Sequence, residues 1–313
     1  MSVNRWLDCK YGLLINMKLK GLVLILFSAL IIAFGCTDPG RSYVKKAVKI
    51  MDRSGLYATG DEWEKAKKEA LSANPVSLEE AHDVVKKALK VAGGKHSFLK
   101  EAEIEVKEKT SEWEMPQVSI TDSCGTKIAV VKLPQFSGNH DEGLKYAKTV
   151  IEAIPEDIEG VIIDLRGNGG GDMYPMISSV HRFIPDGNIL RFRSRKRTMW
   201  INLGYVLQVT GIKQLPAIEC PVAILTDEGT GSSAEALLLC FRGLEKARVF
   251  GSATAGYASS NRPYKMSDGS VMVLTEGCDI SRTGEEFCDD PIEPDVNTDT
   301  PMEDSMSWLK SLK

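Results

Sequence analysis

Strand-like and helix-like segments alternate through the middle of this 313-residue chain. Short apolar, β-branched runs at residues 128–133, 160–165 and 221–226 predict buried strands, and each is followed by a segment with helical periodicity. Strands joined by helices usually pair in parallel, with the helices covering the sheet. The pattern therefore predicts an α/β core with a mostly parallel sheet, and residues 270–295 add further β-structure.

Residues 41–99 have a helical pattern instead. Ser77-Leu78-Glu79-Glu80 has the form of a capping box, and apolar residues follow at helical spacing until Gly93-Gly94 ends the helix. We expect a small N-terminal helical subdomain before the core. The predicted division is a signal segment at 1–36, a helical subdomain at 37–113 and the α/β core at 114–313.

The first 36 residues have the composition of a targeting segment. Basic residues precede an apolar run from Leu22 to Phe34, and Gly35-Cys36 closes the run. A bilayer-spanning helix needs about 20 apolar residues, so this run of 13 favours a signal over a membrane span. It resembles a bacterial lipoprotein signal, which implies lipidation at Cys36 and a place in the cell envelope, facing the periplasm or the exterior. An uncleaved anchor and ordinary secretion remain alternatives.

Charge and cysteine content exclude some classes of function. The formal net charge is −4, which argues against a nucleic-acid partner. No Cys-x-x-Cys pair is present, so we expect no zinc site and no cofactor. Cys278 and Cys288 are spaced for a bridge across a hairpin in an oxidising compartment, which the sequence leaves open, as it does the oligomeric state.

Two polar junctions follow predicted strands. Ser232 stands between the strand at 221–226 and a helix, and a glycine-rich turn at 167–171 follows the strand at 160–165. Unpaired N–H groups at a helix start and in a glycine turn can hold an oxyanion, so Ser232 is a candidate nucleophile. The alternatives are an ordinary N-cap and a structural turn. Glu235, in the first turn of the helix, is predicted to be structural.

The order of these motifs resembles the signature of the tail-specific, or C-terminal processing, serine peptidases. The resemblance implies a ClpP/crotonase-like core, Ser232 as the nucleophile, and an oxyanion hole from the amides of Gly170, Gly171 and Ser233. The four blocks that carry it are Asp164-Leu165-Arg166-Gly167-Asn168-Gly169-Gly170-Gly171, Gly229-Thr230-Gly231-Ser232-Ser233-Ala234-Glu235, Gly251-Ser252-Ala253-Thr254-Ala255-Gly256 and Ile292-Glu293-Pro294-Asp295.

One departure from this signature indicates the branch of the family. Members with a serine–lysine dyad carry a lysine where this chain has Tyr257, and the chain has no room for the PDZ module typical of them. Gly93-Gly94-Lys95-His96-Ser97-Phe98 resembles the histidine block of the tricorn-like and interphotoreceptor-retinoid-binding-protein-like branch. The resemblance implies His96 as the general base. The candidates for orienting its ring are Ser97, Asp289 and Asp290.

A basic run at residues 191–197 stands apart from these blocks. Arg193 and Arg195 could clamp a peptide carboxylate, or the run could be a solvated strand. The predicted function is hydrolysis of peptides or unfolded protein C-termini by acyl-enzyme chemistry. A non-catalytic member of the fold that binds peptides or hydrophobic ligands is the alternative, and acyl-CoA chemistry gains no support from these residues.

Overall fold

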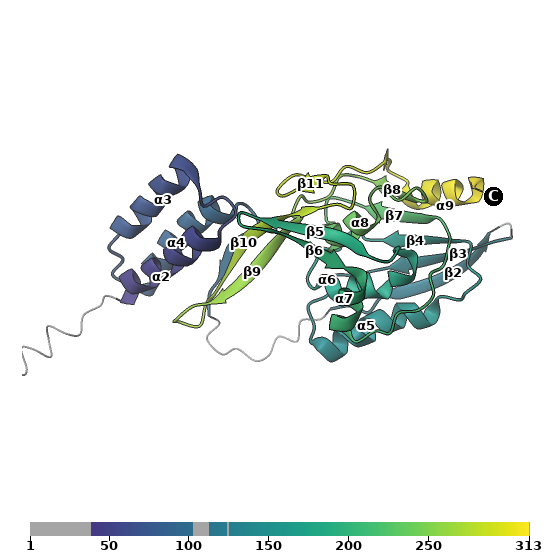
Figure 1. The fold of residues 1–313 in the computed structure, drawn as a ribbon, viewed down its shortest axis with the longest axis horizontal. Coiled ribbons are helices and arrows are strands. Elements are labelled where there is room, and N and C mark those ends of the chain that lie inside the picture. The colour runs from purple at the N-terminus through teal and green to yellow at the C-terminus, as the bar shows by residue number, and fades with distance from the viewer. Residues whose placement is uncertain (1–38, 103–112, 124, 313) are drawn as a thin grey trace, which may run out of the picture.

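A computed structural model describes residues 39–102, 113–123 and 125–312 (Figure 1). Cys36 and the predicted signal segment lie outside the described residues. The described chain contains two β-sheets, with a group of N-terminal helices at one end of the molecule and the C-terminal helix α9 (Pro301–Ser311) at the other. Among the described helices, none has the length and apolar character needed to cross a bilayer.

The first sheet is the predicted parallel core. Its strand order is β12-β8-β7-β4-β3-β2, and every neighbouring pair is parallel except β2 with β3. The strands are β2 (Gln117–Ser123), β3 (Thr126–Lys132), β4 (Gly160–Asp164), β7 (Val222–Thr226), β8 (Ala247–Gly251) and β12 (Val296–Asn297).

Helices cover both faces of this sheet, which explains why its central strands β4 and β7 are buried at every position and mostly apolar. On β4, Val161 and Ile163 face one hydrophobic cluster while Ile162 faces another. The first cluster packs under α5 (His140–Ala153), α6 (Met173–Ser179) and α8 (Ser233–Phe241), and the second packs under α9. Alternation with period two therefore buries every side chain of β4.

The second sheet is antiparallel in all its pairings. Its strands are β1 (Phe98–Lys100), β5 (Asn188–Ser194), β6 (Thr198–Asn202), β9 (Ser259–Lys265), β10 (Val271–Ile280) and β11 (Glu286–Phe287). The helix α7 (Leu203–Thr210) follows β6, and a 3₁₀ turn at His181–Phe183 precedes β5. The sequence indicated β-structure in the tail but did not indicate that β5 and β6, from mid-chain, join it in one sheet.

The N-terminal helices pack on the end of this second sheet, as Figure 1 shows. They are α2 (Pro39–Ser54), α3 (Gly60–Ser72) and α4 (Leu78–Gly93). Ser77 caps α4 by accepting the Glu80 N–H at 3.1 Å, and Gly94 ends it with φ 70°, both as predicted. Met272 and Leu274 of β10 belong to the same hydrophobic cluster as these helices. The predicted helical region is therefore confirmed, and it shares its hydrophobic core with the C-terminal part of the chain.

Candidate active site

Ser232, where β7 leads into α8, has an unusual backbone conformation. Its φ is 54° and its ψ is −115°, and among the described residues it is the one non-glycine residue with positive φ. Ordinary N-caps here are extended, with φ −136° at Ser77 and −80° at Asn139. A side chain held in such a sparsely populated region costs about 1–3 kcal/mol, and such residues cluster at active sites. This conformation favours the nucleophile over the ordinary N-cap.

The carboxylate of Glu235 holds this turn in place. It accepts hydrogen bonds from the Ser232 N–H at 2.7 Å, the Tyr257 N–H at 2.8 Å and the Gly256 N–H at 2.9 Å, and also from the Thr254 hydroxyl. Burial raises the pKa of Glu235, although these hydrogen bonds act in the opposite direction. Glu235 thus joins the start of α8 to the loop at 254–257, in the structural role that the sequence predicted.

The glycine turn after β4 packs directly against the start of α8. A Cβ added at Gly170, whose φ is 105°, would lie 2.7 Å from Ser232 Cβ and 2.9 Å from the Ser233 nitrogen. A Cβ at Gly171 would lie 1.9 Å from the Phe136 carbonyl oxygen. Only glycine allows this approach, so the turn places its backbone amides beside Ser232.

The hydrogen bonds of this turn reduce the number of N–H groups that can serve in the predicted oxyanion hole. The Gly170 N–H donates to Asn168 Oδ1 at 2.9 Å, so Gly170 is not available as a donor, contrary to the prediction. For the N–H groups of Gly171 and Ser233, the described part of the chain supplies no acceptor. The Ser233 hydroxyl donates to the Gly171 carbonyl at 2.6 Å and joins the two backbones. The candidate oxyanion donors are therefore Gly171 and Ser233.

His96 lies in the turn between α4 and β1, partly covered by β9 and its preceding loop. Its Nδ1 is 2.8 Å from Ser259 Oγ, and its ring centroid is 4.9 Å from that of Tyr257. Burial lowers the pKa of His96 to about 4, and the negative charge of Asp289 offsets part of this effect. The ring is therefore neutral at pH 7. If Nδ1–H donates to Ser259, Nε2 keeps the lone pair that a general base needs.

Tyr257 connects the histidine to the nucleophile turn. Its ring packs on His96, and its Cδ2 atom would lie 3.6 Å from a Cβ added at Gly231, the residue before Ser232. Ser232 and Ser259 also line the same cavity, which has a volume of about 730 Å³. Within the described residues, no hydrogen bond joins Ser232 Oγ to the His96 ring. Catalytic hydrogen bonds are often loose in unliganded enzymes and tighten when substrate binds.

The residues predicted to orient His96 have other partners. Ser97 Oγ donates to the Gly93 carbonyl at 2.9 Å and lies 3.0 Å from Thr275 Oγ1, so it ties the turn to β10. Asp289 accepts a hydrogen bond from the Tyr57 hydroxyl at 2.9 Å and reaches His96 only through its charge. The charge of Asp290 acts on Tyr57.

The contact with His96 Nδ1 instead comes from Ser259, which the sequence analysis did not single out. Ser259 begins β9, where it pairs with Cys278 of β10. A serine in a polar strand carries no sequence signal of such a role, because only the register of β9 against β10 brings it to the histidine.

The two arginines predicted to bind substrate are engaged elsewhere. Arg193 forms a bidentate pair with Glu286, and its Nε lies 2.7 Å from Glu286 Oε2. Arg195 donates to the carbonyl oxygens of Ala58 at 2.5 Å and Asp52 at 2.7 Å, and so joins the second sheet to the N-terminal helices. Neither arginine lines the cavity at Ser232. The carboxylate clamp is therefore wrong, because tertiary contacts occupy both side chains.

The cysteines at 278 and 288, whose pairing the sequence left open, form a disulfide between β10 and the segment after β11. Their sulfur atoms and a Glu286 carboxylate oxygen lie within 4.8 Å of one another. The disulfide removes the thiolates that a metal ion would need from this group.

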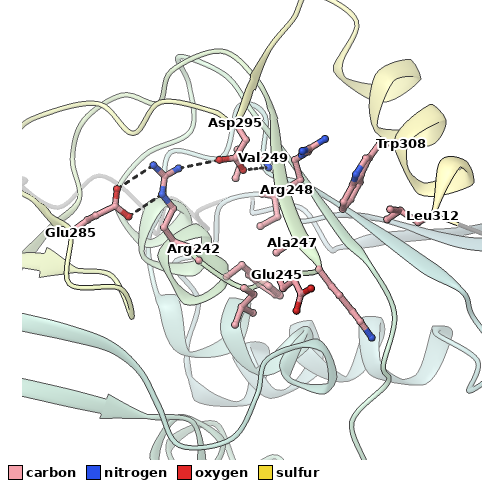
Figure 2. Close-up of a pocket in the computed structure, with 14 residues that line it drawn as sticks. Arg242, Glu245, Ala247, Arg248, Val249, Glu285, Asp295, Trp308 and Leu312 are labelled. Carbon is pink, nitrogen blue, oxygen red and sulfur yellow. Dashed lines mark hydrogen bonds and ion pairs between the residues drawn. The ribbon is translucent and has the colours of Figure 1, made fainter.

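A second cavity, of about 650 Å³, lies between the end of α8, the start of β8 and α9 (Figure 2). Arg242 crosses it and pairs with Glu285 and Asp295, and Trp308 of α9 stands on its other side. The arginine's charge is thus already balanced by two acidic side chains. The described residues that line this cavity include no serine, cysteine or histidine and so supply no nucleophile of the kind found at Ser232.

A strained serine at a helix start, free amides beside it and a half-buried neutral histidine are the groups found in hydrolases with a serine nucleophile. The model of peptidase family S41 matches residues 127–298, which include the glycine turn and Ser232. The chain is 31% identical to the "Nisin-resistance protein" of Lactococcus lactis subsp. lactis over 283 residues, 87% of each protein. It therefore belongs to peptidase family S41, a family of serine peptidases.

Further relatives agree with this assignment. The chain is 26% identical over 188 residues to the "Probable CtpA-like serine protease" of Staphylococcus aureus, covering 60% of this chain and 36% of that longer protein. The solved structure of a lipoprotein from Streptococcus agalactiae has a TM-score of 0.78, 27% identity, and coverage of 90% of this chain and 99% of that one.

The photosystem II D1 C-terminal processing protease shares the fold, with a TM-score of 0.58, 12% identity, and coverage of 84% of this chain and 94% of that one. The predicted fold class, an α/β peptidase core of the tail-specific type preceded by a helical region, is confirmed.

Proposed function

We propose that this chain hydrolyses peptide bonds through an acyl-enzyme on Ser232. The Ser232 hydroxyl attacks the peptide carbonyl carbon while His96 Nε2 takes its proton, and the N–H groups of Gly171 and Ser233 stabilise the oxyanion. His96 then gives the proton to the leaving amine as the C–N bond breaks. Water then attacks the ester carbonyl carbon as the same ring takes its proton. The ester C–O bond breaks, and His96 returns that proton to Ser232 Oγ. Ser259 is a positioning residue that keeps the Nε2 lone pair directed at the nucleophile.

The backbone of Ser232 is the observation that supports this proposal most directly. A serine that only capped α8 would have no need of positive φ, whereas a nucleophile presented at a sharp strand-to-helix turn does. The neutral state of His96 supports the same proposal, since a protonated ring could not accept the hydroxyl proton. The proposal requires the Ser232 hydroxyl and His96 Nε2 to come within hydrogen-bond distance when substrate binds.

Fluorophosphonate labelling and peptide hydrolysis test the two central residues. Ser232→Ala should abolish labelling, and Ser232→Ala and His96→Ala should each lower kcat by at least about 10³-fold. Two variants on the surface are matched controls: Ser307→Ala on α9 and His140→Ala at the start of α5, which should retain labelling and activity. An active, labelled Ser232→Ala protein would refute the proposal. Ligand binding by a wild-type protein that neither labels nor turns over would favour the non-catalytic alternative.

The similarity to the nisin-resistance protein suggests a substrate. We infer that the chain protects a bacterium against nisin or a related peptide by cleaving it, in place of a general role on unfolded protein C-termini. A nisin-sensitive strain that expresses the chain should tolerate a higher nisin concentration, and the Ser232→Ala variant should give no protection. If the wild-type chain and the Ser232→Ala variant protected the strain equally, cleavage would be excluded as the cause of the protection.

We also infer that the mature chain is attached to the envelope through a lipid on Cys36, which supports an encounter with extracellular peptides. Cys36→Ser should abolish metabolic labelling with a fatty-acid analogue and release the protein from the membrane fraction. A Cys36→Ser protein that stays membrane-bound without lipid would favour the uncleaved anchor.

A further inference from the structure

A buried acid lines the candidate substrate cavity without any partner. Asp279, on β10, is only 2% exposed, and its Oδ1 atom is enclosed and makes no hydrogen bond with any described residue. It forms no ion pair in the described part of the chain either. Leaving a polar group buried and unpaired costs about 1–3 kcal/mol, so a group kept in this state is a candidate for binding a ligand.

Asp279 borders the same cavity as the nucleophile. It pairs across the antiparallel sheet with Phe192 of β5, and Phe192, Ala236 and Ser232 line the cavity with it. Ala236 is one helical turn beyond Ser232 on α8, so the wall that includes Ala236 and Asp279 lies next to the point of attack. A substrate side chain adjacent to the cleaved bond would extend toward Asp279.

The electrostatics of the cavity favour a positive charge. Among the described residues, its lining contains two aspartates, Asp172 and Asp279, and no lysine, arginine or histidine. Burial of the site, together with the charge of Glu235, raises the pKa of Asp279 well above its usual range. A bound cation would act in the opposite direction and favour the ionised carboxylate.

The remaining walls suit the stem of a long side chain. Met173, Phe192, Ala236 and Val273 give the cavity an apolar lining, against which the methylene groups of lysine or arginine can pack. The side chains of lysine and arginine combine such a stem with a charged, donor-only end.

We propose that Asp279 is a specificity-determining residue that binds the ammonium or guanidinium group of a lysine or arginine side chain next to the cleaved peptide bond. On binding, the cation donates hydrogen bonds to the ionised carboxylate, and any proton that the carboxyl group held passes to solvent. The inference rests on the proposed peptidase function, because the occupant of the cavity is the peptide that Ser232 attacks.

Peptide pairs that differ at one position test this assignment. Each pair has either lysine or norleucine, its uncharged near-isostere, immediately before the cleaved bond, and kcat/KM is measured for both. In the wild type we expect lysine to be favoured by at least about tenfold. In Asp279→Asn the ratio should fall to about one, while kcat/KM for the norleucine peptide stays within about threefold of wild type. Glu293→Gln removes an exposed acid elsewhere and should leave the ratio unchanged.

Three results would overturn the assignment: a wild-type protein that cleaves both peptides equally, an Asp279→Asn protein that keeps the preference, or an equal loss on both peptides. A glutamine peptide cleaved as well as the lysine peptide would also overturn it, since a neutral hydrogen bond would then suffice. Asp279→Leu, which buries no polar group, provides a second test if the asparagine variant does not fold. Fluorophosphonate labelling of Ser232 in each variant separates two causes of a lower kcat/KM. Reduced labelling would indicate a change in the catalytic residues, and unchanged labelling a change in substrate selection.

Discussion

Replacing Ser232 with glycine should make the protein more stable while removing its activity. The backbone of Ser232, at φ 54° and ψ −115°, lies in a region that suits glycine and strains other residues by about 1–3 kcal/mol. Glycine also gives the unfolded chain more conformational freedom, which lowers the free energy of unfolding by about 0.4–1 kcal/mol. The net change in the free energy of unfolding is a gain of about 0.5–2 kcal/mol.

Ser232→Ala is the matched control for this prediction. It removes the same hydroxyl group but keeps a Cβ, so it retains the strain and should have nearly wild-type stability. Both variants lack the hydroxyl oxygen, so the difference in their free energies of unfolding reports the effect of the backbone conformation at residue 232. Both should be inactive in peptide hydrolysis.

Thermal and urea unfolding measure the difference. For a folded region of this size, about 1 kcal/mol corresponds to about 2–4 °C in Tm, so Ser232→Gly should melt a few degrees above Ser232→Ala. A glycine variant that is equally or less stable than the alanine variant would contradict the claim that the turn is strained.

Four further predictions concern groups near the site. Ser259→Ala should lower kcat by about 10–100-fold with little change in KM, because it removes the hydrogen bond that orients His96 and leaves the substrate cavity formed; a change confined to KM would contradict this role. Because burial lowers the pKa of His96 to about 4, kcat/KM should fall as the pH is lowered, with an apparent pKa near 4 rather than near 6.5. The unfolded chain binds this proton at a higher pH than the folded chain does. The stability from a neutral His96 is therefore present above about pH 6.5 and is lost as the pH falls toward 4. In His96→Ala, the free energy of unfolding should fall less over this pH range. Cys278→Ser with Cys288→Ser opens a loop with a sequence separation of 10 and should lower the free energy of unfolding by about 2–3 kcal/mol; unchanged unfolding in denaturant would argue against the bridge in solution.

The parallel sheet could be predicted because its signal is local. The strand β4 has the apolar run Val161-Ile162-Ile163 at its centre and is followed by a glycine turn, and a strand of this kind is buried on both faces in almost any α/β protein. The helix α4 was predictable for the same reason, since Ser77 and Gly94 mark its two ends within the sequence itself.

The details of the site depended on contacts between distant segments. Ser97 follows His96 in sequence, yet the ring is held by Ser259, which is 163 positions away and reaches it through the pairing of β9 with β10. Arg193 and Arg195 formed a conspicuous basic run, but their partners, Glu286 and the carbonyl groups around α2, cannot be read from local pattern. Gly170 was misjudged because the side chain of Asn168, two residues earlier, occupies its N–H.

The position of His96 makes the proposed activity depend on how two parts of the molecule pack together. The proposed base lies at the end of α4, in the part of the molecule whose hydrophobic cluster joins α2–α4 to β10, whereas the proposed nucleophile starts α8 above the parallel sheet. The proposed base and the proposed nucleophile thus lie on parts of the molecule with different hydrophobic clusters, and the loop carrying Tyr257 is one of the contacts between these parts. A sequence change that loosened the packing of α2–α4 on β10 should therefore lower the proposed activity while α8 and the parallel sheet stay folded.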